Sequence, residues 1–235
     1  MVARGRCWAI VSGMATATGT TRLVVIRHGE SQAQVGGLVS GHDTCEGLSE
    51  RGRRQATALR DRLLAGGELG RVDAVYTSVL ARSIETAAIL RPALGDLAPQ
   101  AECDWCEIHA GEAEGRPVED LRRRRREQGL ANEADGAFQR LVDGAESWAD
   151  CYARLGSRLR RVAREHPGRC VVVVGHGGTV GAGFVALSEV PVRQGSAFTR
   201  VTENTSITEW SCAGGEWQLV RFNDTAHLLT PIGTG

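Results

Sequence analysis

Two histidines, each next to a glycine, follow short apolar runs that lie far apart in the chain. Arg27 and His28 come directly after the run 23–26, and His176 comes after four valines and a glycine at 171–175. A short continuous apolar run is typical of a strand buried on both faces. Functional sites of α/β folds gather at the carboxyl ends of such strands. The two runs therefore predict one site that contains both histidines.

These residue types suit phosphoryl transfer. A neutral imidazole has a lone pair at pH 7, so His28 is a candidate nucleophile. Arg27 and Arg82 can each offer forked donors to phosphoryl oxygens, and their charge would lower the pKa of the histidine and keep it neutral. His176 is a candidate donor that stabilises charge as it spreads over the equatorial oxygens. Because arginines supply the positive charge, we expect the reaction to need no metal and no cofactor.

The spacing of apolar residues and of helix caps predicts the elements that position this site. Ser49 is a candidate N-cap of a helix that Gly66 and Gly67 end, and Ser78 is a candidate cap of a helix that carries Arg82. Further helices are expected at 119–128, 146–165 and 177–187, and strands at 72–76, 203–210 and 217–222, the last two joined by a turn at 214–215. Strands alternate with helices, which favours a three-layer α/β/α sandwich with a mostly parallel central sheet.

Composition and charge narrow the class of protein. The chain has 235 residues, 42% of them hydrophobic and 24% charged, and its 28 basic and 28 acidic residues cancel. Every basic residue is an arginine. A neutral chain has no general attraction to nucleic acid or to a membrane, and no apolar run reaches the roughly 18 residues of a membrane span. We expect a single domain at 21–235 after a disordered leader at 1–20, in a cytoplasmic protein.

Five consecutive arginines, 122–126, stand in the predicted helix 119–128. Glu119, Asp120 and Glu127 balance them, and aromatic residues are not interleaved with them, so we interpret the run as a solvated helix face and not as a nucleic-acid site. A second interpretation stays open, in which one or two of these arginines reach a substrate as part of a lid.

Seven scattered cysteines favour reduced thiols over a disulfide framework. Cys103 and Cys106 form a C-x-x-C pair, which can indicate a zinc or redox site. We count no second pair and no histidine at metal-like spacing beside it, so the sequence disfavours that role.

Several motifs accompany the two histidines in a fixed order. The stretch 27–31 reads Arg-His-Gly-Glu-Ser, the stretch 48–56 carries Leu-Ser-x-x-Gly-x-x-Gln-Ala, and 78–87 carries Ser-x-x-x-Arg-x-x-x-Thr-Ala. Residues 107–115 carry Glu-x-x-x-Gly-x-x-Glu-Gly, and 175–178 read Gly-His-Gly-Gly. This set resembles the histidine phosphatase superfamily, the phosphoglycerate-mutase-like enzymes, from about residue 23 to 228. The resemblance implies a transient phosphohistidine, with no metal and no nucleotide.

The same resemblance implies further roles. Glu107 corresponds to the proton donor of the superfamily's phosphatases, with Glu112 and Glu114 as its nearest competitors. Gln34 replaces the family's phosphate-binding Asn, and Gly177 lies within the second histidine motif. We therefore predict both as phosphate-binding residues.

The motif downstream of Glu107 bears on the reaction. The superfamily's mutases recognise the substrate carboxylate with a Tyr and a Lys, where this chain has Ala110 and Val118. We therefore favour a phosphatase acting on a small phosphorylated metabolite. The alternatives are a phosphoglycerate-type mutase and a non-catalytic module that binds phosphorylated ligands. Relatives are often dimers, so a homodimer is an open expectation.

Overall fold

A computed structural model describes residues 19–129, 134–192 and 202–229 of the chain. The leader predicted at 1–20 lies outside these residues except for its last two. The strands are β1 (Thr21–Arg27), β2 (Ala74–Thr77), β3 (Gln100–Ala101), β4 (Cys170–Gly175), β5 (Ile207–Ala213) and β6 (Glu216–Asp224). They form one six-stranded sheet in the order β3-β2-β4-β1-β5-β6.

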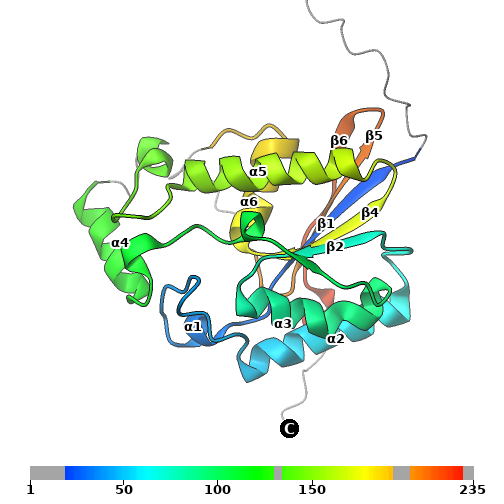
Figure 1. Ribbon diagram of the computed structural model, residues 1–235, viewed down its shortest axis with the longest axis horizontal. Helices are drawn as coiled ribbons and strands as arrows, with labels where there is room; N and C mark the ends of the chain where they lie inside the picture. Colours follow the sequence, from blue (N-terminus) through cyan, green and yellow to red (C-terminus); the bar gives the residue numbers. More distant parts are fainter. Residues whose placement is uncertain (1–18, 130–133, 193–201, 230–235) are drawn as a thin grey trace, which may run out of the picture.

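The helices cover both faces of this sheet (Figure 1). The α-helices are α1 (Gln32–Val35), α2 (Glu50–Gly66), α3 (Ala81–Leu90), α4 (Val118–Glu127), α5 (Trp148–Glu165) and α6 (Gly177–Leu187). Short 3-10 helices are η1 (Arg91–Leu94), η2 (Cys103–Trp105), η3 (Gly111–Ala113), η4 (Ala134–Phe138) and η5 (Ala226–Leu228). Helices α2 and α3 lie on one face and α5 and α6 on the other, while α4 stands at one end of the molecule. None of the described helices is long and apolar enough to cross a membrane.

The sheet is mostly parallel, which confirms the predicted three-layer α/β/α architecture. Parallel pairing joins β3, β2, β4 and β1, and the antiparallel hairpin of β5 and β6 adds to the free side of β1. The strand predicted from 203 begins later, at Ile207, because the preceding residues form a turn over the end of β1. Thr205 has φ +58° in this turn, and its N–H donates to the carbonyl of Arg27 at 3.0 Å.

Alternating side chains of the two central strands fill the core on both faces. Leu23 and Val25 pack with the residues of α5 and α6, and Val24 and Ile26 pack with those of α2 and α3. All four are fully buried, and the valines of β4 alternate in the same way. Burial on both faces explains the continuous apolar runs, because a strand inside a parallel sheet has no solvent-facing side.

The register of β1 and β4 brings the two histidine segments together. Arg27 pairs with Gly175, so His28 and His176 leave neighbouring parallel strands at the same level. The N–H of His28 donates to the carbonyl of Gly175 at 2.9 Å. The predicted meeting of the two strand ends is therefore a direct consequence of the sheet.

Candidate active site

The rings of His28 and His176 meet edge to face, with their centroids 5.1 Å apart. Both side chains are buried. Burial lowers the pKa of each imidazole well below its ordinary value of 6.5, and the charges of Arg82 and Arg27 lower it further. Both rings are therefore neutral at pH 7.

One hydrogen bond fixes the tautomer of His28. Its Nδ1 lies 2.6 Å from the carbonyl oxygen of Gly29. A carbonyl only accepts, so Nδ1 carries the proton and donates it. The lone pair is then on Nε2, so Nε2 is the atom of this ring that is able to attack an electrophile.

Two arginines supply positive charge around this atom. Arg82 stands in the first turn of α3 and is only 5% exposed, with Nη1 3.4 Å from the carbonyl and the hydroxyl of Ser40. Arg27 donates from Nη1 to the carbonyl of Thr202, and its Nε is buried without a partner. Burial lowers the pKa of the Arg27 guanidinium. Among the described residues no carboxylate forms an ion pair with Arg27 or Arg82, which leaves both available to an anion.

His176 is anchored from one nitrogen only. Its Nε2 lies 2.8 Å from the hydroxyl of Ser78 and 3.3 Å from that of Ser83, whereas its Nδ1 is buried without a protein partner in the described chain. When a serine hydroxyl donates to Nε2, the ring proton is on Nδ1 and can be donated to a ligand. The prediction that Ser78 caps α3 is wrong, because the N-cap is Leu80; the hydroxyl of Ser78 accepts from the N–H of Leu80 at 3.3 Å.

The segment after His28 packs against α2 backbone to backbone. A Cβ on Gly29 would lie 2.5 Å from the carbonyl oxygen of Gly52, and one on Gly52 would lie 2.0 Å from that of Glu30. The N–H of Gly29 donates to the hydroxyl of Thr86 on α3 at 3.1 Å. These contacts explain why glycine and threonine accompany the histidine and arginine in the sequence motifs.

Glu107 lies at the N-terminus of α6, beside the two histidines' pocket. Its carboxylate accepts from the N–H of Gly178 at 3.1 Å and from that of Ile108 at 3.2 Å. A Cβ on Gly178 would lie 2.1 Å from Glu107 Oε1, so the glycine makes room for the carboxylate. The charge of Glu107 also raises the pKa of Arg27 against the effect of burial, as expected for neighbours.

The two competing glutamates are placed differently. Glu114 Oε1 accepts from the N–H groups of Gly41, Asp43 and Thr44 at 3.0, 2.8 and 2.9 Å. Burial opposes ionisation, but the hydrogen bonds from Thr44 and Asp43 hold the pKa of Glu114 below its ordinary value. Glu114 therefore fixes the loop at 41–44, and Glu112 is exposed. The geometry favours Glu107 as the proton donor.

The two weaker phosphate-binding candidates lie at the edge of the pocket. Gln34 is exposed and caps α1, because its Oε1 accepts from the N–H of Ser31 at 3.0 Å. Asn204 donates to the same oxygen at 3.1 Å and to the carbonyl of His28 at 3.0 Å, which ties Gln34 to the site. Gly177 is the first residue of α6. Phosphate contact by Gln34 and Gly177 stays a prediction.

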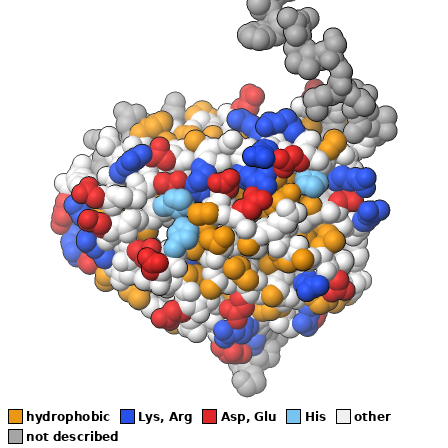
Figure 2. Space-filling view, in the orientation of Figure 1, with side chains coloured by type: hydrophobic (Ala, Val, Ile, Leu, Met, Phe, Trp, Pro, Cys, Tyr) orange, Lys and Arg blue, Asp and Glu red, His pale blue; other side chains and the backbone are white. Residues whose placement is uncertain are grey.

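The arginine-rich run forms an exposed part of α4. Arg122, Arg123 and Arg126 pair with acidic residues of the same helix, as the interpretation of a solvated face requires. Figure 2 shows acidic and basic side chains interleaved over this end of the molecule. Arg125 is partly buried and lines an apolar pocket together with Val39, Ile108, Leu121 and Trp148. This pocket adjoins Glu107 along the chain, so a lid role for this arginine stays open.

Sequence reasoning missed the residues that hold the catalytic groups in place. It gave Thr86 no role beyond matching a pattern, and it assigned no role to Asn204 or to Ser83, whose hydroxyl lies at His176. The signal was present for Thr86, since it follows Arg82 by four residues and so lies one helical turn away. No spacing rule could have placed Asn204, which reaches His28 from across the fold.

Comparisons with known proteins agree with this geometry. The sequence pattern of the histidine phosphatase superfamily (branch 1) matches residues 23–225. Phosphoglycerate mutase-like protein 4 of Arabidopsis thaliana is 28% identical, over 88% of this chain and 86% of that protein. The metal-independent phosphoserine phosphatase of the same plant is 27% identical, over 88% and 83%.

A solved structure extends the comparison to the fold. A mycobacterial glucosyl-3-phosphoglycerate phosphatase, in complex with VO3, superposes with a TM-score of 0.70 at 29% identity, over 86% of this chain and 98% of that one. The chain therefore belongs to the histidine phosphatase superfamily, in its branch 1.

Proposed function

We propose that this protein is a phosphomonoesterase that transfers the phosphoryl group of a small phosphorylated metabolite to His28 and then to water. One observation carries the proposal: the buried, neutral imidazole of His28, with its lone pair on Nε2, lies near two arginines that have no carboxylate partner among the described residues. This arrangement suits a phosphate dianion, because the arginines compensate its charge and the neutral ring can attack phosphorus.

The reaction proceeds in two steps. In the first, Nε2 of His28 bonds to phosphorus while the bond to the leaving oxygen breaks, and protonated Glu107 gives its proton to that oxygen. In the second, Glu107 takes a proton from water, the hydroxide bonds to phosphorus, and the bond to Nε2 breaks. Inorganic phosphate leaves, and both residues return to their starting states.

The surrounding donors stabilise the charge of the transition state. Arg27 and Arg82 bind the equatorial oxygens with charged donors, and the unpartnered Nδ1 of His176 adds a neutral one. These groups are fixed by the fold before the substrate arrives, so little reorganisation is needed during the reaction. No step in this scheme requires a metal ion.

The rim supports a phosphatase over a mutase. Ala110 packs in a small apolar cluster with Val39 and Leu121, and Val118 opens α4, so neither position offers a donor to a substrate carboxylate. The phosphatases among the relatives act, by their names, on phosphoserine and on glucosyl-3-phosphoglycerate. These names support a small phosphate monoester as the class of substrate.

The test is phosphate release in the presence of EDTA, from p-nitrophenyl phosphate and a panel of phosphorylated metabolites. We expect His28→Ala to lower the rate by roughly 10³-fold or more, because the nucleophile is lost. A wild-type protein that binds phosphorylated ligands without turnover would support the binding module instead. A product that keeps its phosphate on another oxygen would support the mutase.

Glu107→Gln tests the proton donor separately. The amide keeps the size of the side chain but has no proton to give, so hydrolysis should slow more for alkyl phosphates than for p-nitrophenyl phosphate, whose leaving group needs no proton. The ratio of the two rates in the variant and in the wild type is the measurement. Equal slowing of both substrates would remove Glu107 from this role.

A further inference from the structure

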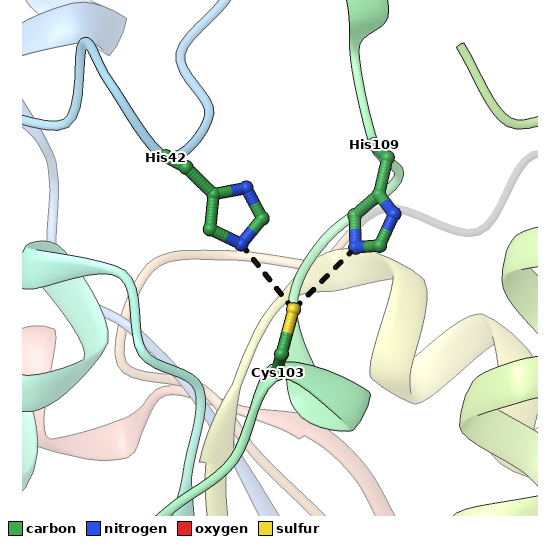
Figure 3. A group of neighbouring side chains, drawn as sticks. All are labelled: His42, Cys103 and His109. Carbon is green, nitrogen blue, oxygen red and sulfur yellow. Dashed lines mark hydrogen bonds between the residues drawn. The ribbon is translucent and has the colours of Figure 1, made fainter. Parts of the chain in front are cut away.

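Two histidines and two cysteines lie together outside the phosphate pocket. His42 belongs to the loop after α1, Cys103 and Cys106 begin and follow η2, and His109 lies three residues further on. Figure 3 shows both imidazole rings turned toward the sulfur of Cys103. The ligand atoms of His42, Cys103 and His109 lie within 4.8 Å of one another. The sequence analysis disfavoured a metal site here because it counted no histidine at metal-like spacing, whereas the fold brings His42 and His109 to the C-x-x-C pair.

The distances in this cluster match those between the ligands of a tetrahedral metal ion. Nε2 of His42 lies 3.3 Å from Cys103 Sγ and 3.6 Å from Cys106 Sγ, and Nε2 of His109 lies 3.9 Å from Cys103 Sγ. A zinc ion with Zn–S bonds of about 2.3 Å and Zn–N bonds of about 2.0 Å would separate its ligand atoms by about 3.3–3.8 Å. Cys106 contacts His42 but lies outside the group of three whose ligand atoms are all within 4.8 Å of one another, so its side chain has to move toward that group to become the fourth ligand.

One atom of each kind is approached twice. Cys103 Sγ is approached by both imidazoles, and Nε2 of His42 is approached by both sulfurs. Without a metal, thiol and imidazole protons can satisfy these contacts as weak hydrogen bonds. When the thiols are deprotonated, a cation at the centre would bind all of these lone pairs at once.

The polar groups behind the cluster are those that commonly orient metal ligands. The carboxylate of Glu146 accepts from the backbone N–H of His109 at 3.0 Å, and it faces the ring Nδ1 at 3.8 Å. A carboxylate behind a ligating histidine is typical of metal sites. Arg154 binds this carboxylate at 2.6 Å and donates to the carbonyls of Asp104 and Cys106 at 3.0 Å each, which holds the cysteine segment in place.

We propose that His42, Cys103, Cys106 and His109 bind one zinc ion at the rim of the active site. Two thiolates and two neutral imidazoles form a ligand set that zinc favours, and the two thiol protons pass to solvent on binding. The four ligands come from two segments 61 residues apart, so the ion would join the loop that follows α1 to the segment that carries Glu107. The ion takes no part in the chemistry at His28, and its role is to hold the loop that contains His42 against the segment 103–109.

Cobalt binding to the full chain tests the site. The reduced protein is freed of metal with a chelator, the chelator is removed, and Co²⁺ is added at neutral pH. We expect the absorption bands of tetrahedral, thiolate-bound cobalt to saturate at one ion per chain, and one equivalent of Zn²⁺ to abolish them. His42→Ala and Cys103→Ser should each weaken binding by more than about tenfold. Cys212→Ser, which removes a thiol on β5, is the matched control and should bind as the wild type does.

A second measurement follows the structural role. Bound Zn²⁺ should slow amide hydrogen exchange at 41–44 and 103–109 in the wild type but not in His42→Ala, because the ion links these two segments. The proposal is overturned if the wild type shows no tetrahedral cobalt spectrum, or if the ligand variants keep it. It is also overturned if peptide mapping of the purified protein finds a Cys103–Cys106 disulfide and the reduced protein binds no cobalt. None of these results depends on phosphatase activity.

Discussion

Two pairs of arginines near the sheet differ in what surrounds them. Arg154 and Arg158 on α5 have carboxylates from their own chain: Arg154 contacts Glu146 at 2.6 Å, and Arg158 contacts Glu102 at 2.7 Å. Arg82 is as deeply placed as Arg158, with 5% and 8% of each residue exposed, but its contacts are a carbonyl, a hydroxyl and a thiol. Arg27 likewise has a carbonyl as partner.

On the proposed function, this difference separates arginines that hold the fold from arginines that bind a ligand. Removing a guanidinium from water costs several kcal/mol, and a carboxylate in good geometry offsets that cost. For Arg154 and Arg158 the offset is present in the protein alone. For Arg82 we propose that a bound anion supplies this offset, so the rest of the fold must hold the residue in place until the anion arrives.

Among the substitutions that test this difference between the arginines, Arg82→Met should produce the largest effect and should separate activity from stability. Loss of one charged donor to the transition state should lower kcat/KM by roughly 10²–10³-fold. The free energy of unfolding should stay within about 1 kcal/mol of the wild type or rise, because a buried charge without a counter-ion is removed. Phosphatase kinetics and denaturant unfolding measure the two effects.

Arg82→Lys is the matched control for this substitution. It keeps the charge but not the forked pair of donors, so its kcat/KM should lie between that of the wild type and that of Arg82→Met. A loss of several kcal/mol of stability in Arg82→Met, with activity retained, would place Arg82 among the structural arginines.

Arg158→Met should show the opposite pattern. It leaves Glu102 and Glu165, which are 32% and 39% exposed, without their partner, and it removes a guanidinium 5.0 Å from the ring of Tyr76. Because these carboxylates are partly hydrated, we expect the free energy of unfolding to fall by about 1–3 kcal/mol, less than for a fully buried pair. The value of kcat/KM should change only a few-fold.

A second substitution shows whether the stranded charge causes that loss. Glu102→Gln added to Arg158→Met should recover part of the stability, since the uncompensated carboxylate is gone. No recovery would mean that lost packing on Tyr76 and Trp105 dominates. An activity loss as large as that of Arg82→Met would remove the distinction between the two pairs.

The sequence predicted the inner part of this molecule well, for a physical reason. The runs 23–26 and 171–174 had to be buried strands because each is uniformly apolar, and both are fully buried. The cap at Ser49 and the turn at 214–215 are also confirmed, because local chemistry determines them. The positions of His28 and His176 follow in turn, because each histidine comes directly after one of these strands.

Contacts between distant loops were not predictable in this way. No periodicity indicates that His42 reaches Cys103, or that Arg82 has no carboxylate partner in the described part of the chain, since each depends on how loops fold over the strand ends. The spacing of Cys103, Cys106 and His109 was the one local signal for the proposed metal site. That signal was too weak alone, because the fourth residue, His42, comes from a loop that only the fold brings near. Whether an arginine has a carboxylate partner also depends on contacts between distant segments, so the sequence alone does not separate the two pairs of arginines.

The pH dependence of activity gives the smallest effect and the finest test of that distinction. Burial lowers the pKa of His28 well below 6.5, and Arg82 and then Arg27 lower it further. Attack requires the neutral ring, so kcat/KM should persist below pH 6.5 and fall only as His28 takes up a proton. In Arg82→Met the acid limb should move upward toward 6.5, whereas in Arg158→Met it should stay where the wild type has it.

The same pKa shift has a consequence for stability, with a definite sign. His28 and His176 are neutral in the folded protein, while the unfolded chain takes up protons near pH 6.5, so stability is lost as the pH falls below that value. Each histidine contributes a slope of at most about 1.4 kcal/mol per pH unit.

The pH profiles of activity are compared between the wild type, Arg82→Met and Arg158→Met. The ionisation of the substrate affects all three in the same way, so it cancels in the comparison. If the acid limbs of all three coincided, burial alone would determine the pKa of His28, and the unpaired arginines would act on the substrate only.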